Sequence, residues 1–538
     1  MGLTRDHSAK WVCLLFLPFV IFLLSYSSVH AQWTSITPPA VSGYWTLSRV
    51  HFTSADEGWV AGWDSENHKG ILLHYQNGTW VSVSPPDVSG SWSLSGVYFT
   101  MADEGWAVGY DDEKLKGILL HYQNGIWTSV TPPEVSGYWS LSGVHFTSAD
   151  EGWAVGWDGE NYRGVLLHYQ DGIWTSVTPP DVSLNWYVAS VHFTSTNEGW
   201  AVGMDSATGQ QYKGVLLRYE NGTWTSVTPP DVSLKWDLAA VHFTSANEGW
   251  AVGSSYVDYN DGGVLLHYQD GIWTSVTPPF SMGPYWRLHG IHFASATEGW
   301  VVGWDYGNYM SALIRYRNGT WISVTPPAVT NDWDLVGVYF TSPTEGWAVG
   351  FDQYNYKGVL FHYLSLWPNK GSIGTQITII DSGFGSEKGK VLIGNASTKI
   401  ISWSDSLITA EIAKVLPLGP HAVVVKPKEP KGAAPIVYNG AFTMLPPETI
   451  SVDPVSGTEG VEITVSGNYF GSKKGKVYLV NPSSGKKKNC KVTSWTMNPT
   501  DGTSVIKFIV PKVDAGNYWL YVSNKVGANP PGVPYQVN

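Results

Sequence analysis

The sequence predicts an all-β protein in which a seven-bladed β-propeller, closed by its N-terminal strand, precedes two C-terminal immunoglobulin-like β-sandwiches. Three observations lead to this fold class. Charged residues make up only 14% of the 538 residues, whereas glycine and tryptophan are abundant; an average domain is about 25% charged. A tryptophan-rich unit recurs along residues 32–367. Beyond residue 367 tryptophan becomes scarce, and two halves of a different texture resemble each other.

Residues 1–31 have the features of a secretory signal. Arg5 and Lys10 precede an apolar run from Trp11 to Leu24, and the segment ending at Ala31 resembles a small-x-small cleavage site. The run is shorter than the about 20 residues that a membrane-spanning helix needs. We expect cleavage after Ala31 and a protein that is secreted or held at the cell surface, with no membrane span after signal removal. The alternative is an uncleaved anchor.

Charge and cysteine content exclude several classes of function. The net charge of −12 argues against nucleic acid as a partner, because phosphate binding needs clustered Lys and Arg. Cys13 lies in the signal, so the mature chain keeps only Cys490. An internal disulfide and a cysteine-based zinc cluster are therefore excluded, and we expect neither a cofactor nor a metal site.

One unit of 47–50 residues repeats seven times. Its leading tryptophans are Trp33, Trp80, Trp127, Trp174, Trp224, Trp273 and Trp321. A fixed period of this length indicates a propeller or a solenoid. The third copy contains strand-like segments at 141–147, 153–157, 164–169 and 174–178, with an Asp-Gly hairpin turn at 171–172. Four short strands without a helix are typical of a propeller blade.

The phase of the repeat predicts how the propeller closes. The mature chain begins with a fourth strand, and the last unit ends after a third strand at 358–363. The seventh blade is therefore expected to combine 333–363 with 32–37. Closure of this kind removes the exposed strand edges that an open array would present.

Residues 368–446 and 447–538 are predicted to form two β-sandwiches. Gly374–Ile379 matches Gly460–Val465, and each half carries a later Ser-Trp pair that ends at Trp403 or Trp495. Alternating short strands over about 80–90 residues indicate small sandwiches. A Pro-Pro pair at 446–447 marks the linker between them. The blades carry a net charge of −20 and the sandwiches +7.

Three patterns resemble known families. The Glu-Gly-Trp-Ala-Val-Gly motif at 151–156 looks like the repeats of photosystem II assembly factor-like propellers. The Asp-Gly-x-Trp turn at 171–174 resembles a degenerate Asp-box of the bacterial neuraminidase repeat (BNR). The C-terminal halves are similar to IPT/TIG domains, which occur in extracellular and cell-surface proteins among others. These resemblances imply the fold rather than a function, because propellers host many functions.

Catalysis is not expected. A sialidase on Asp-box blades would resemble its family by three arginines that grip a carboxylate, a tyrosine nucleophile and an acid/base pair of carboxylates. The mature blades contain six arginines, of which Arg163, Arg218 and Arg315 replace Lys or His at repeat positions. The repeat is hardly broken anywhere. A glycoside hydrolase stays as an alternative.

Repeated polar residues favour structural roles. One histidine position per blade lies at His51, His145, His192, His242 and His292, and another at His74, His121, His168, His267 and His362. Tyrosine replaces the first histidine in two blades, and arginine replaces the second in two others. A metal ligand would not be exchanged so freely, so packing between blades is favoured over metal binding. The aspartates that follow the second strand favour a turn or capping role over calcium. The glutamates before the motif tryptophan are expected to satisfy turn amides.

Aromatic residues provide the candidate binding site. A tryptophan precedes the first strand in every blade, and further aromatic and acidic residues lie in the loops between strands two and three. The predicted ligand contacts are Trp45, Trp92, Trp139, Trp186, Trp236, Trp286, Trp333, Trp157, Asp158, Tyr162, Tyr212, Tyr309 and Tyr356. Both loop sets open on one face of a propeller, and sugars offer apolar faces to aromatic rings and hydroxyls to carboxylates. The alternative is that the tryptophans before strand one wedge between blades as core.

The sequence therefore predicts an exported, non-catalytic binding or adhesion protein that recognises carbohydrate or another cell-surface ligand through one face of the propeller. Several weak sites would act together through effective concentration. An assembly factor or scaffold for a protein client is the alternative, and a sialidase-like glycosidase the second one.

Overall fold

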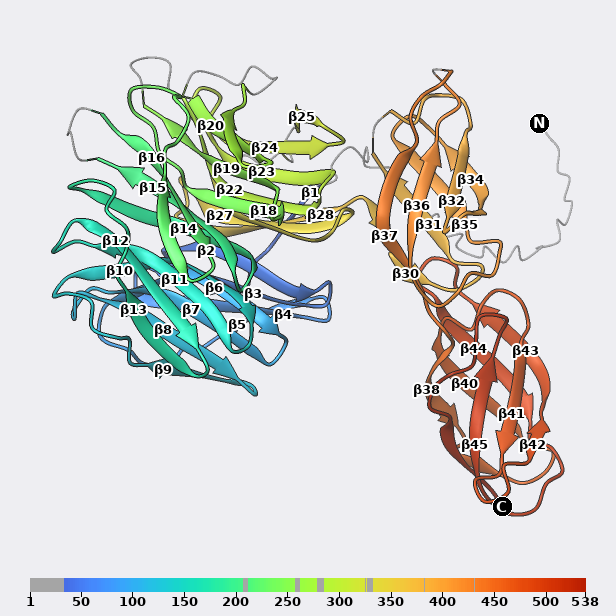
Figure 1. The fold of residues 1–538 in the computed structure, drawn as a ribbon. Coiled ribbons are helices and arrows are strands. Elements are labelled where there is room, and N and C mark those ends of the chain that lie inside the picture. The colour runs from blue at the N-terminus through green and yellow to red at the C-terminus, as the bar shows by residue number, and fades with distance from the viewer. Residues whose placement is uncertain are drawn as a thin grey trace, which may run out of the picture.

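The computed structural model describes residues 33–538 apart from 207–210, 257–261, 278–284, 325, 327–331, 382 and 430. In this part of the chain all regular structure is β, and no helix occurs that could cross a membrane. The expected signal at 1–31 lies outside the described residues. The all-β prediction is confirmed, and Figure 1 shows the blades beside the two C-terminal domains.

Seven four-stranded antiparallel sheets form the blades. The first consists of β2 (Trp45–Ser54), β3 (Glu57–Asp64), β4 (Lys69–Gln76) and β5 (Thr79–Val83). The second consists of β6 (Trp92–Met101), β7 (Glu104–Asp111), β8 (Lys116–Gln123) and β9 (Ile126–Val130). The third consists of β10 (Trp139–Ser148), β11 (Glu151–Asp158), β12 (Arg163–Gln170) and β13 (Ile173–Val177). The fourth consists of β14 (Trp186–Ser195), β15 (Glu198–Asp205), β16 (Lys213–Glu220) and β17 (Thr223–Val227).

The remaining blades keep this order. The fifth consists of β18 (Ala240–Ser245), β19 (Glu248–Ser255), β20 (Gly262–Gln269) and β21 (Ile272–Ser275). The sixth consists of β22 (Trp286–Ser295), β23 (Glu298–Asp305), β24 (Met310–Arg317) and β25 (Thr320–Ser323). The seventh consists of β26 (Trp333–Ser342), β27 (Glu345–Asp352), β28 (Lys357–Leu364) and β1 (Trp33–Ile36).

The seventh blade borrows its outer strand from the N-terminus, as the repeat phase predicts. Strand β1 pairs antiparallel with β28, and Trp33 lies opposite Tyr363. The Trp33 ring is buried against Trp300, Phe340 and Tyr363 at centroid distances of 5.2–5.8 Å. The two ends of the repeat region are thereby joined in one sheet.

Six of the seven blades pack on the next through a glycine and a tryptophan, and blade six has Ser311 in place of the glycine. A Cβ atom on Gly164, the second residue of β12, would lie 2.4 Å from the Trp186 ring of the following blade. The same contact joins Gly358 of the seventh blade to Trp45 of the first. Arg49 also donates to the Val336 carbonyl across this junction, at 2.9 Å. The first and seventh blades are therefore direct neighbours.

A circle of aromatic rings joins the innermost strands. Neighbouring rings have centroids 4.2–4.7 Å apart, and the series returns from the seventh blade to the first. Its members are His51, Tyr98, His145, His192, His242, His292 and Tyr339. The packing role weighed for these histidines in the sequence is the one observed.

The stability of the blades is expected to decrease as the pH falls below about 6.5. Burial lowers the pKa of His51 and His292 to about 3 and that of His192 to about 4, from 6.5. Between these values the unfolded chain takes up protons that the folded ring excludes. The stabilisation is therefore complete above pH 6.5 and is lost towards pH 4, by about 1.4 kcal/mol per pH unit for each histidine.

Urea denaturation at pH 7.5 and pH 5 measures this loss. His192→Tyr copies the residue that blades two and seven carry at the same position, Tyr98 and Tyr339. The variant should lessen the loss of stability by about 1.4 kcal/mol per pH unit. An identical pH dependence in wild type and variant would contradict the exclusion of protons by the buried ring.

Two sandwich domains follow the blades, and both have the same strand order. The first pairs β29 (Leu366–Trp367), β31 (Gln376–Ile380), β35 (Leu407–Glu411) and β34 (Lys399–Trp403) in one sheet. Its other sheet contains β30 (Lys370–Gly371), β37 (Ile436–Met444), β36 (Gly419–Lys426), β32 (Lys390–Ile393) and β33 (Ala396–Ser397).

The second domain repeats this arrangement. One sheet contains β38 (Glu448–Asp453), β40 (Glu462–Asn468), β44 (Thr503–Ile509) and β43 (Lys491–Met497). The other contains β39 (Ser456–Gly457), β46 (Val533–Val537), β45 (Gly516–Ser523), β41 (Lys476–Val480) and β42 (Lys487–Asn489). The matched tryptophans have the same role: Trp403 donates to the Gly385 carbonyl and Trp495 to the Gly471 carbonyl.

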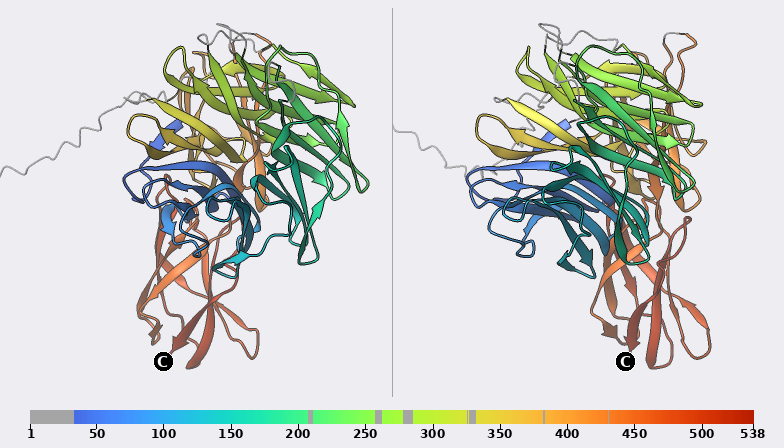
Figure 2. Two further views of the ribbon diagram at one scale, coloured as in Figure 1. Left: turned by 90° about the vertical axis from the view of Figure 1, so that its left-hand side faces the viewer. Right: turned by 60° about the vertical axis from the view of Figure 1, so that its left-hand side comes forward.

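The first sandwich docks on one face of the blades. We call this the turn face, because it carries the turns between strands one and two and between strands three and four. Lys370 pairs with Asp56 in such a turn, at 3.1 Å, and Asn369 donates to Glu345 at 2.8 Å. The opposite side, called the loop face, is formed by the inter-blade loops before each first strand and by the two–three loops. The left view of Figure 2 is taken from the side away from the sandwiches.

A buried ion-pair network fixes this docking. Arg315 of β24 donates to Glu298 of its own blade and to Asp381 of the sandwich, at 2.5 and 3.1 Å. Arg317 also pairs with Asp381, whose second oxygen accepts from Tyr438 at 2.6 Å. Arg315 is only 2% exposed. The charges of two arginines and two carboxylates thus balance one another inside the interface.

Candidate functional site

Exposed aromatic residues gather on the loop face. Every tyrosine of the blades that stands among the exposed large side chains belongs to an inter-blade loop or a two–three loop: Tyr44, Tyr138, Tyr162, Tyr306, Tyr309, Tyr354 and Tyr356. Tyr162 is 54% exposed, Tyr309 68% and Tyr354 77%. The exposed apolar residues of the three–four turns are aliphatic instead, such as Ile126 and Ile173. The two faces therefore differ in chemistry.

Three of the four predicted loop tyrosines are exposed, and the fourth is half-buried. Tyr162 holds its loop through its backbone: its carbonyl accepts from the Trp186 amide at 3.0 Å, and its φ is 54°. His68 and Leu115 occupy the same position in blades one and two with the same backbone conformation. The side chain is thus not needed for the loop. Tyr212 is half-buried beside Lys235.

The tryptophans before strand one pack between blades, which is the alternative weighed for them. Five are at most 3% exposed: Trp45, Trp92, Trp139, Trp186 and Trp236. These five are core residues, so the expectation that they contact a ligand is corrected. Trp286 and Trp333 are half-buried. The Trp286 ring lies against Gly263 of the preceding blade, whereas Trp333 has Ser311 at that position. No local sequence pattern shows these contacts between blades.

Asp158 is a buried turn cap and not a ligand contact. Its Oδ1 accepts from the Ser136 hydroxyl at 2.7 Å and the Asn161 amide at 3.0 Å, and its Oδ2 from the Asn161 side chain at 2.8 Å. Burial raises the pKa of Asp158, but these hydrogen bonds outweigh that effect and the pKa is lowered. The capping role favoured in the sequence is observed. Trp157 stays partly exposed and packs against Tyr138 at 5.5 Å.

The glutamates before the motif tryptophan have a different role from the one expected. Glu151 pairs with His168 at 2.6 Å, and that histidine stacks on Trp153 at 4.3 Å. Equivalent pairs occur in four more blades. Blades four and six use arginine instead, Arg218 and Arg315. The second histidine set is therefore explained by its contacts with these glutamates inside five of the blades.

Blades four to seven break the repeat at the innermost strand. The residue after the tryptophan that enters strand one is Thr46, Ser93 or Ser140 in the first three blades. The next four blades carry larger or charged residues there: Tyr187, Asp237, Arg287 and Asp334. This asymmetry was missed in the sequence, although the signal was a plain substitution at one repeat position. Together with Tyr256, His289 and Tyr306, these four form what we call the axial cluster.

The axial cluster holds Arg287 between two tyrosine faces. The guanidinium carbon lies 4.9 Å from the Tyr256 ring centre and 5.1 Å from that of Tyr306. Tyr256 donates to Asp237 at 2.7 Å, and the Ser254 amide donates to the other oxygen at 2.8 Å. Burial raises the pKa of Asp334 to about 7, partly opposed by Arg287. Charge and aromatic surface are thus combined on one side of the axis.

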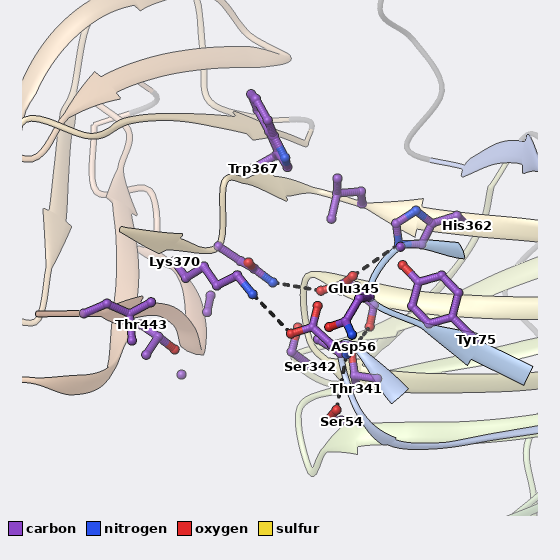
Figure 3. Close-up of a pocket in the computed structure, with 18 residues that line it drawn as sticks. Ser54, Asp56, Tyr75, Thr341, Ser342, Glu345, His362, Trp367, Lys370 and Thr443 are labelled. Carbon is purple, nitrogen blue, oxygen red and sulfur yellow. Dashed lines mark hydrogen bonds and ion pairs between the residues drawn. The ribbon is translucent and has the colours of Figure 1, made fainter. Parts of the chain in front are cut away.

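A cavity of about 590 Å³ lies between the turn face and the first sandwich. Figure 3 shows Lys370 reaching Asp56 across it, with Glu345 and His362 on the blade side. Its charged groups pair with one another. The cavity therefore belongs to the docking contact, and the loop face remains the candidate ligand site. Among the described residues no group of three or more His, Cys, Asp or Glu side chains is placed to hold a metal ion.

The family comparison identifies the first sandwich. The IPT/TIG domain family matches residues 363–444, so the class of this domain is defined. The resemblance of the blades to photosystem II assembly factor-like and Asp-box repeats stays a prediction. A search of curated proteins gave no match.

A search of solved structures found matches of low similarity. The extracellular region of plexin A4 is 8% identical, over 94% of this chain and 76% of that chain, with a TM-score of 0.37. A protein of unknown function from Bacteroides thetaiotaomicron is 8% identical, over 61% of this chain and 100% of that chain, with a TM-score of 0.33. The surface glycan-binding protein PbSGBP-B from Prevotella bryantii is 16% identical over 31% and 37% of the two chains, with a TM-score of 0.17. These values carry no argument about function.

Proposed function

We propose that this chain is an exported, non-catalytic binding or adhesion protein, built as a closed seven-bladed propeller that recognises carbohydrate on its loop face. The pairing of β1 with β28 and the contact of Gly358 with Trp45 support closure. The sandwiches act as spacers or as docking modules towards the cell surface. The contact of the first sandwich with the turn face leaves the loop face free.

The observation that carries the proposal is that, among the described residues, every exposed blade tyrosine lies on the loop face. Aromatic side chains that stay exposed on a rigid scaffold mark interaction sites. Polar groups stand beside them in the same loops, including Asn161 and the exposed Glu160. Flat apolar rings next to carboxylates and amides suit the apolar faces and hydroxyls of sugars.

A protein client is the second candidate. Leu184 and Leu234 in two inter-blade loops are 87% and 64% exposed. Aliphatic side chains of this size suit a protein surface better than a sugar. Both lie on the loop face, so the two candidates compete for the same surface.

A glycan array with the full mature chain tests the function class. Binding to a set of related glycans supports the proposal. An empty array together with capture of one purified protein partner favours the scaffold role. Turnover of a chromogenic glycoside would establish an enzyme and overturn the non-catalytic assignment.

A further inference from the structure

The axial cluster contains a cation whose hydrogen-bond donors are unused within the described residues. Arg287 has contacts to the faces of Tyr256 and Tyr306, but no hydrogen bond or ion pair is formed there. Stacking of this kind holds the plane of a guanidinium and leaves its N–H edge available. A planar edge with parallel donors matches a carboxylate in bidentate fashion.

A buried acceptor without a donor lies in the same cluster. Asp334 is 7% exposed, and within the described part of the chain its Oδ1 has no hydrogen-bond partner. His289 Nε2, 3.5 Å from that oxygen, is likewise buried and lacks a hydrogen-bond partner among those residues. Buried polar atoms are normally satisfied, so an unfilled pair points to a missing group.

Space is available along the innermost strands that carry these residues, although Arg287, His289 and Asp334 do not themselves line it. A central cavity of about 130 Å³ is lined by the innermost strands of all seven blades. Its wall includes Gly290, which follows His289, and Val336, two residues after Asp334. Arg49 from the first blade also lines it. A volume of this size admits a small polar group, since a water molecule takes about 30 Å³.

We propose that Arg287 anchors the carboxylate of an acidic sugar, and that a neighbouring hydroxyl of this sugar hydrogen-bonds to Asp334. The inference rests on the proposed carbohydrate function and names its ligand class, a uronic acid residue. The tyrosines beside Arg287 then border the sugar ring. The blades carry a net charge of −20, so their overall electrostatic potential does not attract an anion. Binding of the carboxylate would therefore depend on the Arg287 guanidinium itself.

The proposed site makes affinity dependent on pH. Asp334 faces Arg287 and His289 of β22, and Arg49 of β2 lies near His289. Burial and these two arginines lower the pKa of His289 to about 4, so it stays neutral between pH 6 and pH 8. A bound carboxylate favours the protonated form of Asp334. Affinity should therefore decrease as the pH rises through about 7.

Calorimetric titration with two probes tests the inference. One probe is an oligomer of galacturonic acid, and the other is its methyl ester, which has the same sugar ring without the charge. The acid should bind at least about tenfold more tightly to the wild type, the range expected for a charge-assisted pair. Arg287→Gln should remove this preference, and Asp334→Asn should make affinity for the acid equal at pH 6 and pH 8.

Arg163→Gln is the matched control, because Arg163 also lies on the loop face but already pairs with Asp158 at 3.5 Å. It should keep the preference for the acid. Arg287→Lys tests the fork geometry if the glutamine variant folds poorly, since lysine keeps the charge and loses the parallel donors. Equal binding of acid and ester by the wild type, or full preference in both Arg287 variants, would overturn the acidic-sugar site. Neutral glycans binding on the array would then leave the proposed function standing, whereas an empty array removes both.

Discussion

Replacement of Arg315 by leucine is expected to release the first sandwich from the blades. The change leaves Glu298 without its 2.5 Å partner and removes one of the two arginines that face Asp381. Breaking a buried ion pair on one side costs about 3–5 kcal/mol, because the remaining charge stays desolvated. Asp381 keeps Arg317 and Tyr438, so we expect loss of docking and not unfolding of the sandwich.

Small-angle scattering and hydrogen exchange measure this effect. The variant should be more extended, and amides around Asp381 and in the turn face should exchange faster. Arg218→Leu is the matched control: it removes the same repeat position in blade four, where the arginine is 31% exposed and pairs only within its blade. A surface pair contributes about 0–1 kcal/mol. Equal extension of both variants, or of neither, would contradict the role of Arg315 as the docking residue.

Trp33→Ala is expected to open the seventh blade. Trp33 is buried against three aromatic rings, and truncation of a buried tryptophan costs about 3–5 kcal/mol. No turn links β1 to β28, so the weakened strand can detach. The freed β28 edge would then pair with other chains.

Trp174→Ala provides the comparison for this prediction. Trp174 has the same repeat position in blade three, but its strand is tied to β12 by the hairpin turn at Asp171 and Gly172. Both variants should lose stability in denaturant titrations. Only Trp33→Ala should also self-associate and lose its N-terminus to protease. Self-association of both variants to the same extent would argue against a special role of β1.

The blades could be predicted because their signals are local and repeated. Each strand is bounded by a turn such as Asp171-Gly172, whose residues have φ values of 48° and 89° that suit a type I′ hairpin. The pairing of the N-terminal strand β1 with β28 in blade seven could be predicted from the phase of the repeat alone. The match between the two sandwiches was also visible, and Trp403 and Trp495 do occupy equivalent positions.

The contacts between blades and between domains could not be predicted from the sequence, because they join residues that are distant along the chain. The burial of Trp186 depends on Gly164 of the preceding blade. The Arg315 network joins residues 66 positions apart, and no local pattern pairs them. The axial cluster needs four innermost strands to meet at one axis. Single substitutions within the repeat, at Arg287, Arg315 and Asp334, were the available signal, and their meaning came only from the neighbours that the fold provides.

The loop-face tyrosines give the most direct test of the central claim. Tyr162, Tyr212, Tyr309 and Tyr356 are changed together to alanine, because avidity would mask a single loss. Each lost ring contact weakens a site by about 1–3 kcal/mol. Folding should be nearly unchanged, since His68 and Leu115 show that the position of Tyr162, Tyr309 and Tyr356 does not need tyrosine, and Tyr212 is only half-buried. The control changes Ile126, Ile173 and Ile272 to alanine on the turn face, where they are 64–66% exposed.

The decisive measurement is the affinity of both variants for a glycan that the wild type binds on the array. We expect the tyrosine variant to melt like the wild type and to lose binding, whereas the isoleucine variant should bind at full strength. A folded tyrosine variant that binds as tightly as the wild type would contradict this claim and place the ligand away from these four tyrosines.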